Sequence, residues 1–448
     1  MKMKSSPPPP FLNLLILLLF SAVLRHSTAA TSSYPKEALP TKSGYLKVNS
    51  STGSSIFYTY YESQTSSNKN TSISQSPILI WLQGGPGCSS QLANFFELGP
   101  FLLNQDLSLK PNPGSWNKIF SLLFLDNPIG TGFSIAASPE EIPRNQFDVA
   151  KHLFIAINKF IGLDKSFKTR PIYLTGESYA GKYLPALGYY ILKKNAILPK
   201  EKRINLGGIA IGNGLTDPEI QVSTHAVNCY NLGLINEEQM TLLEKLQLEV
   251  VGFIRSGKWN EAGNARNVVL NTLTNMTGLA TLYDFRRLNP YPNRVVVKFL
   301  NNMEVKRALG VKESMIFELC SRTVGDALHD DVMKSVRYMV DFLVKRTRVL
   351  LYQGQCDLRD GVLSTLSWVK KMKWDDIDEF LKAERSIWRV DGNLAGYVQK
   401  WKSLSHVVVL NAGHLVPTDQ PLNSQVMIQD WVLERGLFGS EKSGKDGH

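Results

Sequence analysis

The sequence has 448 residues, a formal net charge of +11 at pH 7 and four cysteines. This length is sufficient for a large enzyme core with an inserted segment, whereas the cysteines are too few for a disulfide-dense scaffold. The Lys and Arg residues are scattered and are not interleaved with aromatic residues, which argues against a nucleic-acid partner.

The first 30 residues have the features of a secretory signal peptide. Two lysines precede an apolar stretch at residues 11–24, and small residues follow up to Ala30. The stretch is shorter than the ~20 residues that span a bilayer, and Asn13 interrupts it. We therefore expect cleavage, which removes three basic residues and no acidic one, leaves a formal charge of +8, and leaves no membrane span.

Three sequons agree with a secretory route, because glycosylation of such triplets occurs along it. They are Asn49-Ser50-Ser51, Asn70-Thr71-Ser72 and Asn275-Met276-Thr277. The expected location is extracellular or vacuolar. The sequence leaves the oligomeric state open, a homodimer included.

The first part of the core is predicted at residues 31–217. Two β-rich runs at 45–48 and 55–61 predict an N-terminal hairpin with Asn49 at its exposed tip. Continuous apolar runs, typical of strands buried on both faces, follow at 78–82, 122–125, 172–175 and 206–211. Helical patterns lie at 148–160 and 183–194. This alternation predicts an α/β fold around a mostly parallel sheet.

A helical insertion is predicted at residues 218–300, where the pattern changes to helices such as the amphipathic stretch 236–250. The second part of the core is predicted at 301–440, followed by a polar tail at 441–448. Its apolar runs at 349–352 and 407–410 are expected to be the last two strands of the sheet.

The candidate nucleophile is Ser178, in Gly176-Glu177-Ser178-Tyr179-Ala180-Gly181. The segment follows an apolar run and precedes a helical pattern, as in a nucleophile elbow. A serine hydroxyl is a poor nucleophile unless a base and oxyanion donors lie beside it. The chain must therefore supply those partners elsewhere.

The expected partners are Asp357 and His414, which follow the serine in the order Ser, Asp, His. Each lies in a glycine-containing loop just after a predicted strand, at the sheet edge where open α/β sheets place their sites. Asp360 is the nearest rival of Asp357. The remaining histidines lie in the leader, at the tail, or outside a glycine-flanked loop after a strand, namely His26, His448, His152, His225, His329 and His406.

The candidate oxyanion donors are the backbone N–H groups of Gly85 and Tyr179. One follows the nucleophile, and the other lies in the glycine-rich loop after the first apolar run. Glycines there let the backbone approach a substrate.

Short blocks spread over most of the chain carry a specific resemblance. They are Gly84-Gly85-Pro86-Gly87-Cys88-Ser89-Ser90, Phe96-Glu97-Leu98-Gly99-Pro100, Ser115-Trp116-Asn117, Leu125-Asp126-Asn127-Pro128, Gly132-Phe133-Ser134, the serine block, Gly212-Asn213-Gly214 and Gly413-His414-Leu415-Val416-Pro417. Together they resemble the serine carboxypeptidase family, including plant serine carboxypeptidase-like proteins. The resemblance implies an α/β-hydrolase fold with a helical insertion. It also implies removal of single C-terminal residues from peptides, usually in an acidic compartment.

The same resemblance implies that Gln83, Glu97 and Glu177 hold the free carboxylate of a peptide substrate. Gln83 stands where the family has asparagine. Glutamine keeps the amide group and places it one methylene farther from the backbone. Two adjacent carboxyl groups do not both ionise cheaply, so at least one of the glutamates should keep its proton and donate it to that carboxylate.

The resemblance further implies a Cys88–Cys320 disulfide, which leaves Cys229 and Cys356. Cys356 is either a free thiol near the site or a buried, inert cysteine. The sequence contains no C-x-x-C and no Cys/His cluster, so no metal is implied, and no cofactor is expected.

Two other functions compete with peptide hydrolysis. Acyl-transferring relatives, which use sugar esters as donors, tend to carry aspartate where this chain has Glu177. A secreted binding or protective protein could keep the fold without chemistry, but an intact set of Ser178, Asp357 and His414 argues against it.

Overall fold

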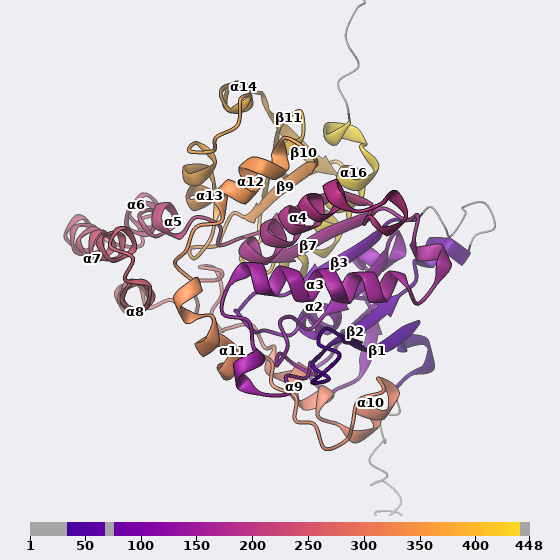
Figure 1. Ribbon diagram of the computed structural model, residues 1–448. Helices are drawn as coiled ribbons and strands as arrows, with labels where there is room; N and C mark the ends of the chain where they lie inside the picture. Colours follow the sequence, from indigo (N-terminus) through magenta and orange to yellow (C-terminus); the bar gives the residue numbers. More distant parts are fainter. Residues whose placement is uncertain (1–33, 68–75, 440–448) are drawn as a thin grey trace, which may run out of the picture.

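The computed structural model describes residues 34–67 and 76–439. The predicted signal peptide, Asn70 and the polar tail lie outside these ranges. Ten strands form one sheet in the order β1-β2-β6-β3-β7-β8-β9-β12-β11-β10, and β4 and β5 form a separate pair (Figure 1). The strands are β1 (Lys42–Lys47), β2 (Ser55–Tyr61), β3 (Ile78–Leu82), β4 (Phe101–Leu103), β5 (Leu109–Pro111), β6 (Ser121–Leu125), β7 (Ile172–Glu177), β8 (Leu206–Gly212), β9 (Arg348–Gly354), β10 (Arg385–Val390), β11 (Asn393–Trp401) and β12 (Leu404–Val409).

The six central strands, from β6 to β12 in the sheet order, pair in parallel, and both flanks pair antiparallel. The α-helices are α2 (Gln91–Phe96), α3 (Gln146–Ile161), α4 (Ala180–Ile197), α5 (Pro218–Val222), α6 (His225–Asn231), α7 (Glu237–Arg255), α8 (Trp259–Thr277), α9 (Arg294–Leu300), α10 (Met303–Ala308), α11 (Arg322–Ala327), α12 (Arg337–Val344), α13 (Val362–Val369), α14 (Ile377–Lys382), α15 (Val416–Asp419) and α16 (Pro421–Leu433). The expected mostly parallel α/β sheet is confirmed.

Helices cover both faces of the sheet, which explains the continuous apolar runs. In β3, Ile78, Ile80 and Leu82 pack into one core cluster with α3, α4 and α12, whereas Leu79 and Trp81 pack into another with α16. Successive side chains of a strand point to opposite faces, so a strand covered on both sides needs apolar residues at every position. Figure 1 shows α3, α4 and α12 on the same side of the sheet.

The expectation that the runs at 349–352 and 407–410 are the last two strands of the sheet, with no strand between them, is wrong. β10 and β11 lie between β9 and β12 in the sequence, and they form the antiparallel edge of the sheet beside β12. Their side chains are largely exposed or half-buried. An edge strand with solvent on one face lacks the continuous apolar run of a central strand, so the pattern that marked the other strands was absent here.

Helices alone connect β8 to β9 in the described chain. Helices α5 to α8 share a core cluster of their own and project away from the sheet (Figure 1). Helix α7 begins with a capping box between Asn236 and Gln239 and ends at Arg255, five residues beyond the predicted stretch. No helix of residues 34–67 or 76–439 combines the length and the apolar character needed to cross a bilayer.

Candidate active site

Ser178 lies in a sharp turn between β7 and α4 with φ of 63°. Its backbone N–H donates to the Gly212 carbonyl at 3.0 Å. A Cβ atom at Gly84 would lie 2.6 Å from the Tyr179 nitrogen and 2.7 Å from the Ser178 Cβ. Only glycine therefore lets the loop after β3 pack against the turn. A left-handed, non-glycine residue in such a tight turn is strained, as expected for a nucleophile elbow.

His414 and Asp357 lie side by side in the loops after β12 and β9. Asp357 Oδ2 lies 2.7 Å from His414 Nδ1. This contact orients the ring and leaves Nε2 as the nitrogen for proton transfer. Nε2 is buried and has no hydrogen-bond partner among the described residues. His414 and Ser178 line the same cavity of about 240 Å³.

Three further groups hold the Asp357 carboxylate. Asn213 Nδ2 donates to Oδ2 at 2.7 Å, the Arg359 N–H donates to Oδ1 at 2.7 Å, and the Asp360 N–H donates to Oδ2 at 3.2 Å. These donors fix the position of the carboxyl group beside His414. The sequence argument missed Asn213 in this role, although the Gly-Asn-Gly block after a buried strand was a usable signal.

The rival carboxyl, Asp360, points elsewhere. It is buried, and its Oδ1 lies 3.9 Å from Arg266 Nη2 and accepts from Gln221 Nε2 at 3.5 Å. No hydrogen bond links it to His414 among the described residues. The geometry therefore favours Asp357 as the partner of the histidine.

The returning segment 282–285 after α8 binds both loops. The Leu358 N–H donates to the Leu282 carbonyl at 3.0 Å, the Phe285 N–H donates to the Cys356 carbonyl at 3.2 Å, and the His414 N–H donates to the Tyr283 carbonyl at 2.7 Å. The Tyr283 ring also stacks on His414, with centroids 4.4 Å apart. This support had no local signal in the sequence, because it joins three distant segments.

The backbone N–H groups of Gly85 and Tyr179 flank Ser178. Gly85 has φ of 115° and lines both cavities that reach Ser178. Neither N–H donates a hydrogen bond to the described part of the chain. The Tyr179 side chain is buried, and its hydroxyl donates to Asp331 Oδ2 at 2.7 Å. Both N–H groups are therefore free for a developing oxyanion.

Gln83 and Glu177 line the same cavity as Ser178 and His414. Trp81 Nε1 donates to Gln83 Oε1 at 2.8 Å, which turns Gln83 Nε2 toward Glu177 Oε1, also at 2.8 Å. The Glu177 Oε2 atom is buried and has no partner among the described residues. Glu97 does not line the cavity and lies in contact with Glu177.

Burial is the main cause of the raised pKa of both glutamates. It raises the pKa of Glu97 to about 8, with a further contribution from the charge of Asp419. It also raises the pKa of Glu177 well above the usual range, and the charge of Glu97 adds to this. The pair therefore retains a proton under mildly acidic conditions, as an apolar site with two neighbouring carboxyl groups requires.

The cysteines divide into one disulfide and two thiols. Cys88 and Cys320 form the disulfide, which joins the glycine-rich loop to the segment before α11. Cys229 and Cys356 are free and buried, and burial raises their pKa to about 12 and about 11. A thiol with a raised pKa is a poor nucleophile at neutral or acidic pH, so Cys356 has the inert character of a structural cysteine.

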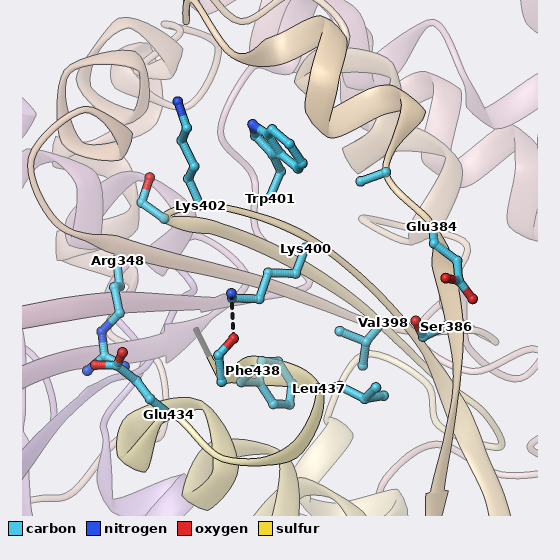
Figure 2. Close-up of a pocket in the computed structure, with 13 residues that line it drawn as sticks. Arg348, Glu384, Ser386, Val398, Lys400, Trp401, Lys402, Glu434, Leu437 and Phe438 are labelled. Carbon is cyan, nitrogen blue, oxygen red and sulfur yellow. Dashed lines mark hydrogen bonds and ion pairs between the residues drawn. The ribbon is translucent and has the colours of Figure 1, made fainter. Parts of the chain in front are cut away.

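A larger cavity, about 720 Å³, lies away from these residues between β10, β11 and the chain end after α16 (Figure 2). Its basic side chains already have partners. Arg348 pairs with Glu434 at 3.1 Å, Lys400 donates to the Gly439 carbonyl at 2.8 Å, and Lys402 pairs with an Asp376 oxygen at 2.6 Å. Among the described residues that line it there is no His or Cys. It lacks the chemistry of an active site.

Comparisons with known proteins give the family of the chain. The profile of the family described as serine carboxypeptidase, peptidase family S10, matches residues 34–434. The chain is 55% identical over 415 residues to serine carboxypeptidase-like 50 of Arabidopsis thaliana, covering 92% of this chain and 91% of that protein. It is 32% identical to serine carboxypeptidase S10 family member 1 of Dictyostelium discoideum, covering 87% and 93%.

A solved structure matches the fold. The crystal structure of Kex1, a prohormone-processing carboxypeptidase of Saccharomyces cerevisiae, superposes with a TM-score of 0.79 at 27% identity, covering 89% of this chain and 92% of that one. The described sheet and its helices therefore form an α/β-hydrolase fold. From the family match and the two relatives, the chain belongs to the serine carboxypeptidase family.

Proposed function

We propose that this enzyme releases C-terminal residues from peptides with a free carboxylate, using Ser178, His414 and Asp357. The observation that carries the proposal is the buried group of Gln83 and Glu177 in the same cavity as Ser178 and His414. A protonated glutamate and an amide are suitable donors to a terminal carboxylate. A general esterase would not need such a group.

The proposed chemistry follows the positions of the reacting atoms. Ser178 Oγ attacks the carbonyl carbon of the last peptide bond while its proton passes to His414 Nε2, and the Gly85 and Tyr179 N–H groups stabilise the oxyanion. Collapse breaks the C–N bond, and His414 returns the proton to the departing amine. Water, deprotonated by His414, then hydrolyses the acyl-enzyme and regenerates the Ser178 hydroxyl.

Glu97 acts in this proposal as a positioning residue. It contacts Glu177 and does not line the cavity. Its buried carboxyl group disfavours a second negative charge, so the shared proton stays with the pair when a substrate carboxylate binds. Raising the pH through the pKa of the pair removes that proton and places negative charges beside the substrate carboxylate. Binding should therefore be retained at acidic pH and weaken as the pH rises through about 8, the raised pKa of Glu97.

The Glu177→Gln variant tests this dependence. An amide donates a hydrogen bond at every pH, so we expect the variant to retain peptide binding at higher pH than the wild type does. The measurement is KM for a blocked dipeptide at several values between about pH 5 and about pH 9, a range that includes the pKa of about 8. The C-terminal amide of the same dipeptide is the control, since it lacks the carboxylate. Identical KM profiles for the two proteins would remove the carboxyl-pair argument.

A substrate comparison tests the proposed reaction itself. Purified mature protein is offered a blocked dipeptide, its C-terminal amide, and an acyl-glucose with an alcohol acceptor. We expect the dipeptide to be cleaved fastest at mildly acidic pH, because the free carboxylate is recognised there. Consumption of acyl-glucose with an intact dipeptide would instead identify an acyltransferase, and no turnover of any substrate would leave a binding protein.

We also propose a secretory route, with the signal peptide removed after residue 30 and delivery to the cell exterior or a vacuole. Asn275 supports glycosylation because it is exposed in the last turn of α8. Asn49 is half-buried between β1 and β2, and its amide nitrogen lies 3.4 Å from Glu141 Oε2, so a glycan there must replace that contact.

The proposed division into 31–217, 218–300 and 301–440 makes α5 to α9 an insertion in the core.

A further inference from the structure

Two cavities meet at Ser178 and share Gly85. The first contains Gln83 and Glu177, the proposed site for the terminal carboxylate. The second, about 250 Å³, shares only Gly85 and Ser178 with the first and is otherwise lined by different residues. A peptide bound with its scissile carbonyl at Ser178 and its terminal carboxylate in the first cavity directs the preceding residue away from it. The second cavity therefore receives the side chain of the penultimate residue.

Two arginines from separate parts of the chain line this second cavity. Arg266 comes from α8 and is only 6% exposed. Its guanidinium makes no hydrogen bond to a described residue, and its one ion pair, to Asp360, has a long separation of 3.9 Å. Arg359 has no ion pair within the described chain and lies 5.3 Å from the Tyr283 ring centroid. Arginine is normally buried only with a well-placed acceptor, so Arg266 lacks the partner that its burial demands, and the half-buried Arg359 has no ion pair of its own.

The acidic groups of the cavity do not balance these arginines. Burial raises the pKa of Asp360, whereas the charges of Arg266, His414 and Arg359 lower it. Asp326 also lines the cavity, but its side chain is exposed and lies 3.8 Å from Arg322, which is not part of the lining. His329 lines the cavity beside Gly263 of α8, and the buried His225 lies close enough for the charges of both arginines to lower its pKa. Among the lining side chains that are buried or half-buried, two arginines therefore face the single carboxyl group of Asp360, which is an excess of positive charge.

We propose that the second cavity selects peptides whose penultimate side chain is a carboxylate, glutamate or aspartate. Arg266 and Arg359 donate to the two oxygens of that group, which supplies the acceptor that the buried Arg266 and the half-buried Arg359 lack. Charged hydrogen bonds of this kind are short and strong, and the planar guanidinium matches a carboxylate in shape. The inference rests on the proposed peptidase function and names the substrate class of the same site.

Blocked dipeptides that differ only at the penultimate position test the inference. Glutamate, glutamine and lysine are compared before a common C-terminal phenylalanine at about pH 5.5, where a glutamate side chain with a pKa of about 4.3 is ionised. We expect kcat/KM for glutamate to exceed that for glutamine, its neutral isostere, by roughly tenfold or more. Lysine should be the poorest of the three. Equal values for glutamate and glutamine, or a preference for lysine through Asp360, would overturn the inference.

Two independent variants locate the preference. Arg266→Gln and Arg359→Gln should each reduce the ratio of glutamate to glutamine kcat/KM toward one, while cleavage of the glutamine peptide continues. Arg255→Gln removes a positive charge from an arginine side chain that is 72% exposed at the end of α7, and it should leave the ratio unchanged. A ratio preserved in both cavity variants contradicts the assignment. Failure to cleave any dipeptide would overturn the proposed function instead, and the wild-type series decides the preference if a variant does not fold.

Discussion

Replacing Ser178 by alanine is expected to lower kcat on a blocked dipeptide by roughly 10⁶-fold, with the fold retained. The hydroxyl is the only group of the proposed site that forms a covalent bond to the substrate. Without this hydroxyl, water is the only nucleophile that His414 can activate. The Gly85 and Tyr179 N–H groups can then stabilise only the oxyanion that forms when water attacks. Alanine fits the turn because it is smaller than serine, so the thermal unfolding midpoint should change little. Steady-state kinetics and a fluorophosphonate label, which reacts with activated serines, measure the two consequences.

Ser223→Ala is the matched control, since it removes an exposed hydroxyl that donates only to the Glu219 carbonyl. Activity and labelling should match the wild type. Retention of activity in Ser178→Ala would exclude the proposed mechanism.

Asp357→Asn is expected to lower kcat by roughly 10⁴-fold, because the carboxylate fixes the tautomer of His414 and stabilises the imidazolium that forms during attack. In this chain, His414 Nδ1, Asn213 Nδ2 and the Asp360 N–H all approach the same Asp357 oxygen. Asparagine can place either its NH₂ group or its oxygen at the position of this carboxylate oxygen. The NH₂ group would face other donors, and the amide oxygen would carry no full negative charge to stabilise the imidazolium. Single-turnover rates with a blocked dipeptide whose penultimate side chain is neutral measure the chemical step separately from binding.

Asp360→Asn is the control for this change, because Asp360 is equally buried, belongs to the same loop and does not contact His414. With a substrate that has a neutral penultimate residue, its kcat should stay within about tenfold of the wild-type value, since its carboxyl group takes no part in proton transfer. An equal loss in both variants would contradict the assignment of Asp357.

The central sheet was predictable because its strands are covered on both faces. The run at 78–82 matches β3, and the run at 206–211 lies within β8. A continuous run of apolar residues was sufficient to predict these two strands. β10 and β11 escaped prediction because strands at a half-exposed edge carry polar side chains and are specified by pairing with β12, which is a nonlocal property.

The part of the site that could be predicted consists of residues in the loops directly after strands of the sheet. Ser178, Asp357 and His414 each come after a strand of a parallel sheet, so their convergence at one edge follows from the topology. Arg266 and Tyr283 come from the helical segment between β8 and β9, where no strand fixes the direction of the chain. Their approach to the serine and the histidine depends on how α8 packs, and no local pattern encodes that packing.

The hydrogen bonds made by residues 282–285 set a boundary on evolutionary change. The helices before this segment line the penultimate-residue cavity through Arg266, so their replacement would alter substrate preference. The segment itself is tied to the loops of Asp357 and His414 by three backbone bonds. Backbone bonds tolerate changes of side chain but not of chain path. A lineage could therefore exchange the helices freely as a specificity module, provided that the chain re-enters the catalytic centre along the path of residues 282–285.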